Sequence, residues 1–78
     1  MGSLIKPVID IIETGKKLKS FRELNHLTVD QLRKKLFFEK PQVIYNWESG
    51  KNLPSVFNFI ALASNYGVTI NEFGVSSK

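Results

Sequence analysis

The sequence predicts an all-α domain, a compact bundle of about five short helices. Apolar residues recur at helical spacing along most of the chain. Helix-start signals and glycine stops separate these periodic stretches. With 78 residues and no cysteine, the chain must form one small core without disulfides or thiolate-bound metal.

The first predicted helix covers residues 15–26, with Leu18, Phe21 and either Leu24 or Asn25 on its apolar face. Charged side chains form its polar face: Lys16, Lys17, Lys19, Arg22 and Glu23. Residues 1–13 are expected to form a separate segment that is interrupted by Pro7 and too apolar for a free arm. We therefore expect an extended segment, an arm or an extension that is not free but packs on the core or on a second subunit.

The second predicted helix covers residues 29–36 and begins with a capping box. Thr28 can cap the amide of Gln31, and the Gln31 side chain can reach back to Thr28. The exposed side of this helix carries Arg33, Lys34 and Lys35.

The third predicted helix covers residues 41–48, because Pro41 suits the first turn of a helix. Its inward side chains are Val43, Ile44 and Trp47. The i, i+3, i+4, i+7 spacing places four polar side chains on one outward face: Gln42, Tyr45, Asn46 and Ser49. Helices two and three, with the loop that follows, have the outline of a helix-turn-helix.

Ser55 opens a fourth predicted helix, which Gly67 ends. The residues at its core spacing are Val56, Phe59, Leu62, Ala63 and Tyr66. Thr69 and Glu72 form a second capping box, which begins a short fifth helix. One domain over residues 14–74 and a frayed tail at residues 75–78 complete the expected organisation.

The composition narrows the function classes. Eleven basic against seven acidic residues give a net charge of +4 and a pI near 9.6, which makes nucleic acid a candidate partner. A single histidine and no cysteine predict no metal site, and nothing points to another cofactor. The chain contains no catalytic constellation and no apolar run long enough to span a membrane, so we expect a cytoplasmic protein that is not an enzyme.

Residues along the chain resemble the helix-turn-helix family of phage Cro and lambda-type repressors, also called the XRE family. The matching features follow one another over residues 14–73: Gly15, Leu18-Lys19, Phe21-Arg22, Leu27-Thr28, Leu32, Ile44, Trp47-Glu48, Gly50, Pro54, Ala61-Leu62-Ala63, Tyr66-Gly67-Val68 and Asn71-Glu72-Phe73. The sequence departs from the family pattern at Val29, Arg33 and Phe37, where a glutamine, an alanine and a turn glycine are usual. The segment 37–40 is also one residue longer than the usual turn.

The resemblance implies a lambda-repressor-like fold that binds double-stranded DNA and regulates transcription, most simply as a repressor. The third helix would then enter the major groove, where Gln42, Asn46 and Tyr45 read bases instead of serving as ordinary solvated surface. The expected backbone contacts are Thr28, Gln31, Lys40, Ser49, Lys51, Asn52 and Arg22. Arg22 and Glu48 are also expected to form an ion pair that is either structural or merely exposed.

A homodimer is expected from the same resemblance. Phe57, Ile60, Ala61 and Ser64 would form its face on the fourth helix, unless Phe57 covers the isoleucines of the N-terminal segment. The alternative function is a protein-interaction module on the same scaffold, such as an antirepressor-like or antitoxin-like subunit. Its partner would be a protein in place of DNA, and three features keep it open: the changes at Val29 and Phe37 and the apolar N-terminal segment.

Overall fold

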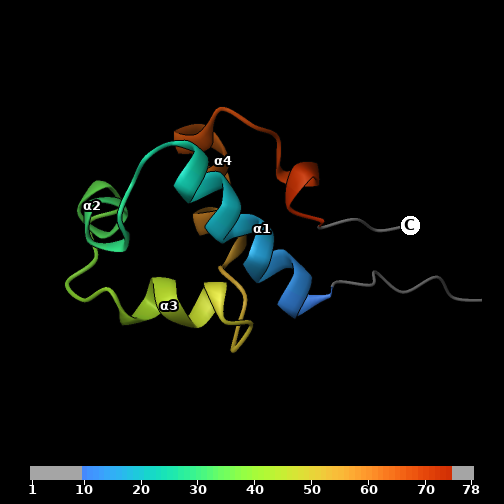
Figure 1. Ribbon diagram of the computed structural model, residues 1–78, viewed down its shortest axis with the longest axis horizontal. Coiled ribbons are helices and arrows are strands. Elements are labelled where there is room, and N and C mark those ends of the chain that lie inside the picture. Colours follow the sequence, from blue (N-terminus) through green and yellow to red (C-terminus); the bar gives the residue numbers. More distant parts are fainter. Residues whose placement is uncertain (1–9, 75–78) are drawn as a thin grey trace, which may run out of the picture.

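The computed structural model describes residues 10–74, which form a bundle of helices around one core (Figure 1). In chain order the elements are α1 (Ile11–Leu24), α2 (Val29–Lys35), α3 (Gln42–Glu48), α4 (Val56–Tyr66) and the short 3-10 helix η1 (Ile70–Phe73). No strand occurs within these residues. The predicted all-α bundle is confirmed.

The first helix begins earlier than predicted. The Asp10 carboxylate accepts hydrogen bonds from the backbone N–H groups of Ile12 and Glu13, both at 3.1 Å, and so caps a helix that begins at Ile11 rather than Gly15. Residues 10–13 therefore belong with the first helix, and its predicted start at residue 15 is wrong. The rest of the expected N-terminal segment, residues 1–9, and the tail at 75–78 lie outside the described residues.

All four α-helices end in the same way, with a backbone N–H two or three residues past the helix closing back onto a carbonyl of the last turn. The bonds run from Leu27 to Arg22, Phe38 to Arg33, Lys51 to Asn46 and Val68 to Ala63, at 3.1, 3.1, 2.9 and 3.0 Å. The residue just before each donor has a positive φ: His26, Phe37, Gly50 and Gly67. Gly67 is the stop predicted for the fourth helix, and Gly50 is likewise a glycine, whereas His26 and Phe37 hold a left-handed conformation that usually favours glycine.

The core contains the apolar faces of all five elements: Leu18, Val29, Leu32, Ile44, Trp47, Phe59, Leu62, Ala63, Tyr66 and Phe73. Three expectations about burial are wrong. Leu24 is 71% exposed because it lies about 120° around the helix from Leu18, and Asn25, the other residue considered for the apolar face, is exposed as well. Val56 is 72% exposed because it is the first residue of α4, at the end of the buried stripe. Arg22, expected on the polar face, is buried.

Gly15 sets how closely α1 approaches α3. A Cβ atom on this residue would lie 2.5 Å from the carbonyl oxygen of Trp47 and 2.7 Å from that of Glu48. Only glycine therefore allows the first turns of α1 to pack directly on the last turn of α3. This crossing positions the side chains discussed next.

Candidate nucleic-acid interface

Helix α3 presents a polar face to solvent. Ile44 and Trp47 are 0% and 4% exposed and anchor the helix, while Gln42, Tyr45 and Ser49 are exposed and Asn46 is half-buried. The helix begins at Gln42, one residue later than predicted, and Pro41 lies directly before it. In Figure 1 the helix lies at the lower edge of the molecule, with its outer side free of other described elements. The outward face expected from the sequence is thus present.

Two carboxamides on this face are joined. The Gln42 Nε2 group donates a hydrogen bond of 2.9 Å to Asn46 Oδ1, one helical turn further on. Each side chain keeps unused donors or acceptors, because a carboxamide offers two N–H groups and two lone pairs. The two side chains therefore form a single hydrogen-bonding surface along α3.

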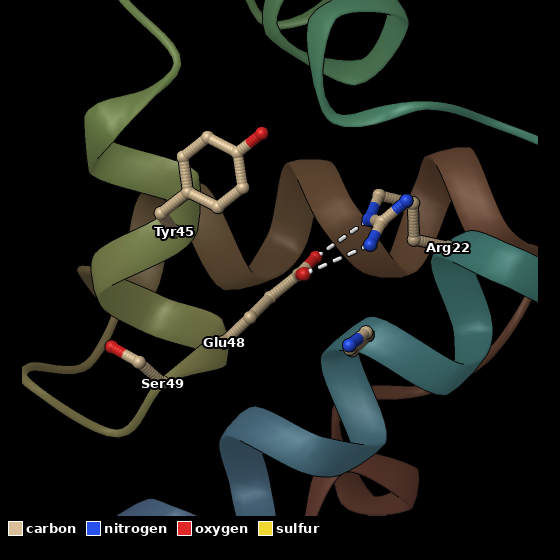
Figure 2. A pocket seen from close by; sticks show the side chains of 5 residues that line it. Arg22, Tyr45, Glu48 and Ser49 are labelled. Atoms are coloured by element: carbon tan, nitrogen blue, oxygen red, sulfur yellow. Dashed lines mark hydrogen bonds and ion pairs between the residues drawn. The ribbon is translucent and has the colours of Figure 1, made fainter.

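A buried ion pair fixes α3 to α1. Arg22 Nε donates to Glu48 Oε2 at 2.8 Å, and Arg22 Nη2 donates to Glu48 Oε1 at 3.0 Å (Figure 2). The third bond runs from Arg22 Nη1 to the carbonyl oxygen of Leu27 at 2.8 Å and ties in the loop before α2. The hydrogen bond from Arg22 to the Glu48 carboxylate raises the pKa of Arg22 against the opposing effect of burial.

The side chains of this pair are only 10% and 8% exposed. The expected ion pair therefore joins three parts of the chain in a water-poor setting and is not an exposed surface pair. Arg22 acts first as a structural residue, and its expected phosphate contact stays a prediction.

A hollow of about 210 Å³ lies between α1 and α3, beside the ion pair. Its lining residues are Lys19, Arg22, Tyr45, Glu48 and Ser49. Figure 2 shows Glu48 reaching from α3 to Arg22, with Tyr45 one turn earlier on α3. Sequence reasoning placed Lys19 only on the polar face of its helix, although its position three residues before Arg22 indicated a shared side.

The expected backbone-contact residues fall into two groups. Thr28 and Gln31 form the predicted capping box, with the Thr28 N–H bonded to Gln31 Oε1 at 2.8 Å and the Gln31 N–H to Thr28 Oγ1 at 3.1 Å. The second group surrounds the ends of α3. Lys40 precedes α3. The loop that follows α3 turns back, so that the N–H groups of Lys51 and Asn52 both donate to the Asn46 carbonyl, at 2.9 and 3.3 Å.

The unusual turn between α2 and α3 has its own support. Arg33, in place of the small residue usual in the family, bonds through Nε to Asp30 Oδ1 at 2.7 Å and through Nη1 to the Phe38 carbonyl at 3.0 Å. The Phe38 ring packs edge-on against Trp47, with ring centroids 5.6 Å apart. Phe37 takes the place of the turn glycine with a φ of 61° and points into solvent at 93% exposure. The longer turn is therefore compatible with the packing of α2 and α3.

Helix α4 carries the apolar residues considered for self-association. Phe57 is 82% exposed and Ile60 is 52% exposed, while Ala61 is half-buried and Ser64 is exposed. The exposed Val56 extends this surface. The alternative role of Phe57 as a cover for the N-terminal isoleucines stays a prediction, because two of the four, Ile5 and Ile9, lie outside the described residues.

Within residues 10–74, no group of three or more His, Cys, Asp or Glu side chains could hold a metal ion. None of the helices in this part of the chain is both long and apolar enough to cross a membrane.

Comparison with protein families decides the classification. The model of the helix-turn-helix family matches residues 18–73, well over half of the chain. The chain belongs to this helix-turn-helix family. The resemblance to XRE-type proteins seen in the sequence is thereby confirmed, and the match spans the residues from α1 to η1. No curated protein matches the sequence.

Solved structures of helix-turn-helix proteins share the fold. The restriction-modification controller protein C.AhdI from Aeromonas hydrophila superposes with a TM-score of 0.73 at 20% identity, covering 82% of this chain and 96% of its own. The BldD DNA-binding domain from S. venezulae gives a TM-score of 0.69 at 26% identity, with 81% and 93% coverage. The clp gene regulator ClgR from C. glutamicum gives 0.69 at 19% identity, with 80% and 79% coverage.

Proposed function

We propose that this helix-turn-helix protein binds double-stranded DNA at specific sequences and regulates transcription, as a repressor that acts by occupying its site. The main observation behind this proposal is the carboxamide face of α3, formed by Gln42 and Asn46. Ile44, Trp47 and the Arg22–Glu48 pair hold the opposite side of this helix against the core. The solved structures named above support it, because one is described as a DNA-binding domain and another as a gene regulator.

In this proposal α3 enters the major groove and its exposed side chains read base edges. Gln42 and Asn46 suit adenine, because a carboxamide can accept from N6 and donate to N7 of the same base. Tyr45, 52% exposed beside them, contacts a thymine methyl group or a phosphate. The 2.9 Å bond between Gln42 and Asn46 makes the two readers dependent on one another.

The phosphate contacts come from residues around the ends of α2 and α3. Thr28 and Gln31 lie at the start of α2, and Lys40, Ser49, Lys51 and Asn52 flank α3. Such contacts fix the position of the protein on the duplex but carry no sequence information. Arg22 contributes chiefly by holding α3 in place, with two N–H groups of its guanidinium still unused.

We further propose a cytoplasmic homodimer that joins through α4. Phe57 and Ile60, with Ala61 and Ser64, form a small exposed surface that includes two large apolar side chains, which a second copy would remove from water. A two-fold dimer would present two α3 helices to successive major grooves, about one DNA turn apart.

The test is selection of bound duplexes from a randomised pool by the purified protein at physiological salt, followed by sequencing. An enriched inverted repeat is expected, with half-sites about 10 base pairs apart. Weak binding that depends strongly on salt and shows no sequence preference would instead reflect the net positive charge alone and would contradict the proposal.

A protein partner in place of DNA is the second candidate. The observation that favours it is Phe37, an aromatic side chain 93% exposed in a turn where the family usually has glycine. This function predicts that the protein selects no DNA sequence but that Phe37→Ser abolishes capture of the partner.

A further inference from the structure

We propose that residues 4–9 of one copy pack against α4 of the second copy, so that exchanged N-terminal segments complete the dimer. This inference rests on the proposed homodimer and names the segment that its interface needs besides α4. The receiving surface consists of Val56, Phe57 and Ile60, and we call it the α4 face.

The α4 face has the composition of an interface core. Its three side chains are 72%, 82% and 52% exposed, and they lie within about 100° of arc around the helix. None of the 11 residues of α4 is charged, although 23% of the whole chain is charged. Interface cores are depleted of charged residues and enriched in aromatic ones. The α4 face therefore indicates a surface that another protein segment covers.

This face is too small to hold a dimer by itself. Burying a phenylalanine removes about 150–250 Å² from water, and the other two side chains are smaller. The exposed parts of all three supply roughly half of the about 800 Å² that each partner contributes to a standard interface. A contact of α4 with α4 alone would leave the interface incomplete, so more apolar surface must join it.

Residues 4–9, which lie outside the described residues, contain the apolar side chains to do so. Four of the six are large and aliphatic: Leu4, Ile5, Val8 and Ile9. Their burial is favourable in proportion to the apolar area removed from water. The α4 face is also the best match for them in residues 10–74, because the other exposed large hydrophobic side chains are spread over α1, the α2–α3 turn and α3.

The segment joins the domain next to the loop that leads into α4. Asp10 has extended backbone angles, with φ −82° and ψ 102°, and α1 begins only after it. In the first turn of α1, the Ile12 Cα would lie 3.1 Å from a Cβ atom on Gly50, in the loop between α3 and α4. Figure 1 shows the start of α1 beside this loop. Six extended residues span about 20 Å, against about 10 Å between two packed helices, so the segment is long enough to reach a second copy.

The receiving α4 belongs to the second copy. A segment that folded onto its own α4 would cover Phe57 and Ile60 and remove the surface through which the two copies join. When the segments are exchanged, the same contact covers the α4 face and enlarges the dimer interface. A closed two-fold arrangement gives each copy one donated and one received segment.

The first experiment measures the dimer dissociation constant of the full chain by sedimentation equilibrium, with far-UV circular dichroism as the check on folding. For Ile5→Ser/Ile9→Ser we expect dimerisation at least about tenfold weaker at unchanged helix content, because two aliphatic side chains leave the interface. Leu24→Ser is the matched control, since Leu24 is 71% exposed at the far end of α1. It should keep the wild-type dissociation constant.

Mixing two variants separates exchange from folding back. One variant carries the damaged segment, Ile5→Ser/Ile9→Ser, and the other carries the damaged α4 face, Phe57→Ser/Ile60→Ser. Neither homodimer contains an intact segment paired with an intact face across the dimer, whereas the mixed dimer contains one such pair. We expect the dissociation constant of the mixed dimer to lie at least about fivefold below the geometric mean of the two homodimers.

A mixed dimer no tighter than that mean would overturn the exchange. Tighter dimerisation of Ile5→Ser/Ile9→Ser would also overturn it, since the segment would then cover its own α4. The same holds if this variant dimerises normally but binds DNA more weakly, because the segment would then contact DNA. A wild type that stays monomeric would contradict the proposed homodimer as well, whereas a dimer indifferent to all these changes would refute the exchange alone.

Discussion

Arg22 on α1 and Glu48 on α3 form a two-bond ion pair, at 2.8 and 3.0 Å, that is almost fully shielded from water. Breaking such a pair leaves a buried charge without a partner. We expect Glu48→Gln to lower the free energy of unfolding by about 3–5 kcal/mol, measured by urea denaturation. The double variant Arg22→Met/Glu48→Leu should lose less than the sum of the two single changes. Full additivity would contradict a direct interaction.

Phe37 should be a site of stored backbone strain. Its φ of 61° is costly for any residue with a Cβ, and its side chain is 93% exposed and has little packing to lose. Phe37→Gly should therefore raise the free energy of unfolding by about 0.5–1 kcal/mol, after the greater freedom of glycine in the unfolded chain is offset. Phe37→Ala keeps the Cβ and should change little. Equal effects of the two substitutions would exclude backbone strain as the cause.

The contrast between the helix ends shows what the sequence could predict. Thr28 and Ser55 were identified as helix starts because capping depends on residues close in sequence. His26 and Phe37 were not identified as the left-handed stops of α1 and α2, because that conformation normally selects glycine. The start at Asp10 was missed although its cap is local, because Pro7 and the apolar run around it indicated an extended segment.

The candidate site likewise combines features that the sequence predicts with features that it does not predict. The outward face of α3 follows from helical spacing alone, and the bond between Gln42 and Asn46 fits their i, i+4 positions. The burial of Arg22 and the hollow beside it depend on the α1–α3 crossing, which periodicity does not reveal. Only the resemblance to a known family placed Arg22 opposite Glu48.

Tyr66 should limit stability at alkaline pH. Its hydroxyl is buried and has no hydrogen-bond partner among residues 10–74. Burial, with a smaller effect of the Glu48 carboxylate, raises the pKa of Tyr66. The folded protein therefore retains a proton that the unfolded chain releases above about pH 10, so stability falls as pH rises beyond that point.

Tyr66→Phe removes both the buried hydroxyl without a partner and the titration of that hydroxyl. We expect it to stabilise the protein by about 1 kcal/mol at pH 7 and to flatten the alkaline loss, measured by thermal unfolding between pH 7 and 11. A destabilised variant would instead reveal a partner for the hydroxyl.

Gly15 should tolerate no side chain. Because a Cβ there would meet two carbonyl oxygens of α3, Gly15→Ala should cost about 1–3 kcal/mol despite the better helix propensity of alanine. Ser20→Ala, at an exposed position of the same helix, is the control and should change stability by less than about 0.5 kcal/mol. Unchanged stability of Gly15→Ala would show that the helices are less closely packed than described.

The central claim is that α3 reads DNA through Gln42 and Asn46. Its most direct test compares the affinity of the wild type and of Gln42→Ala/Asn46→Ala for the selected duplex and for a scrambled one, with the melting temperature as the check on folding. We expect the double variant to lose at least about 30-fold of the preference for the selected duplex at an unchanged melting temperature. A double variant that melts like the wild type and keeps its full preference would contradict the claim.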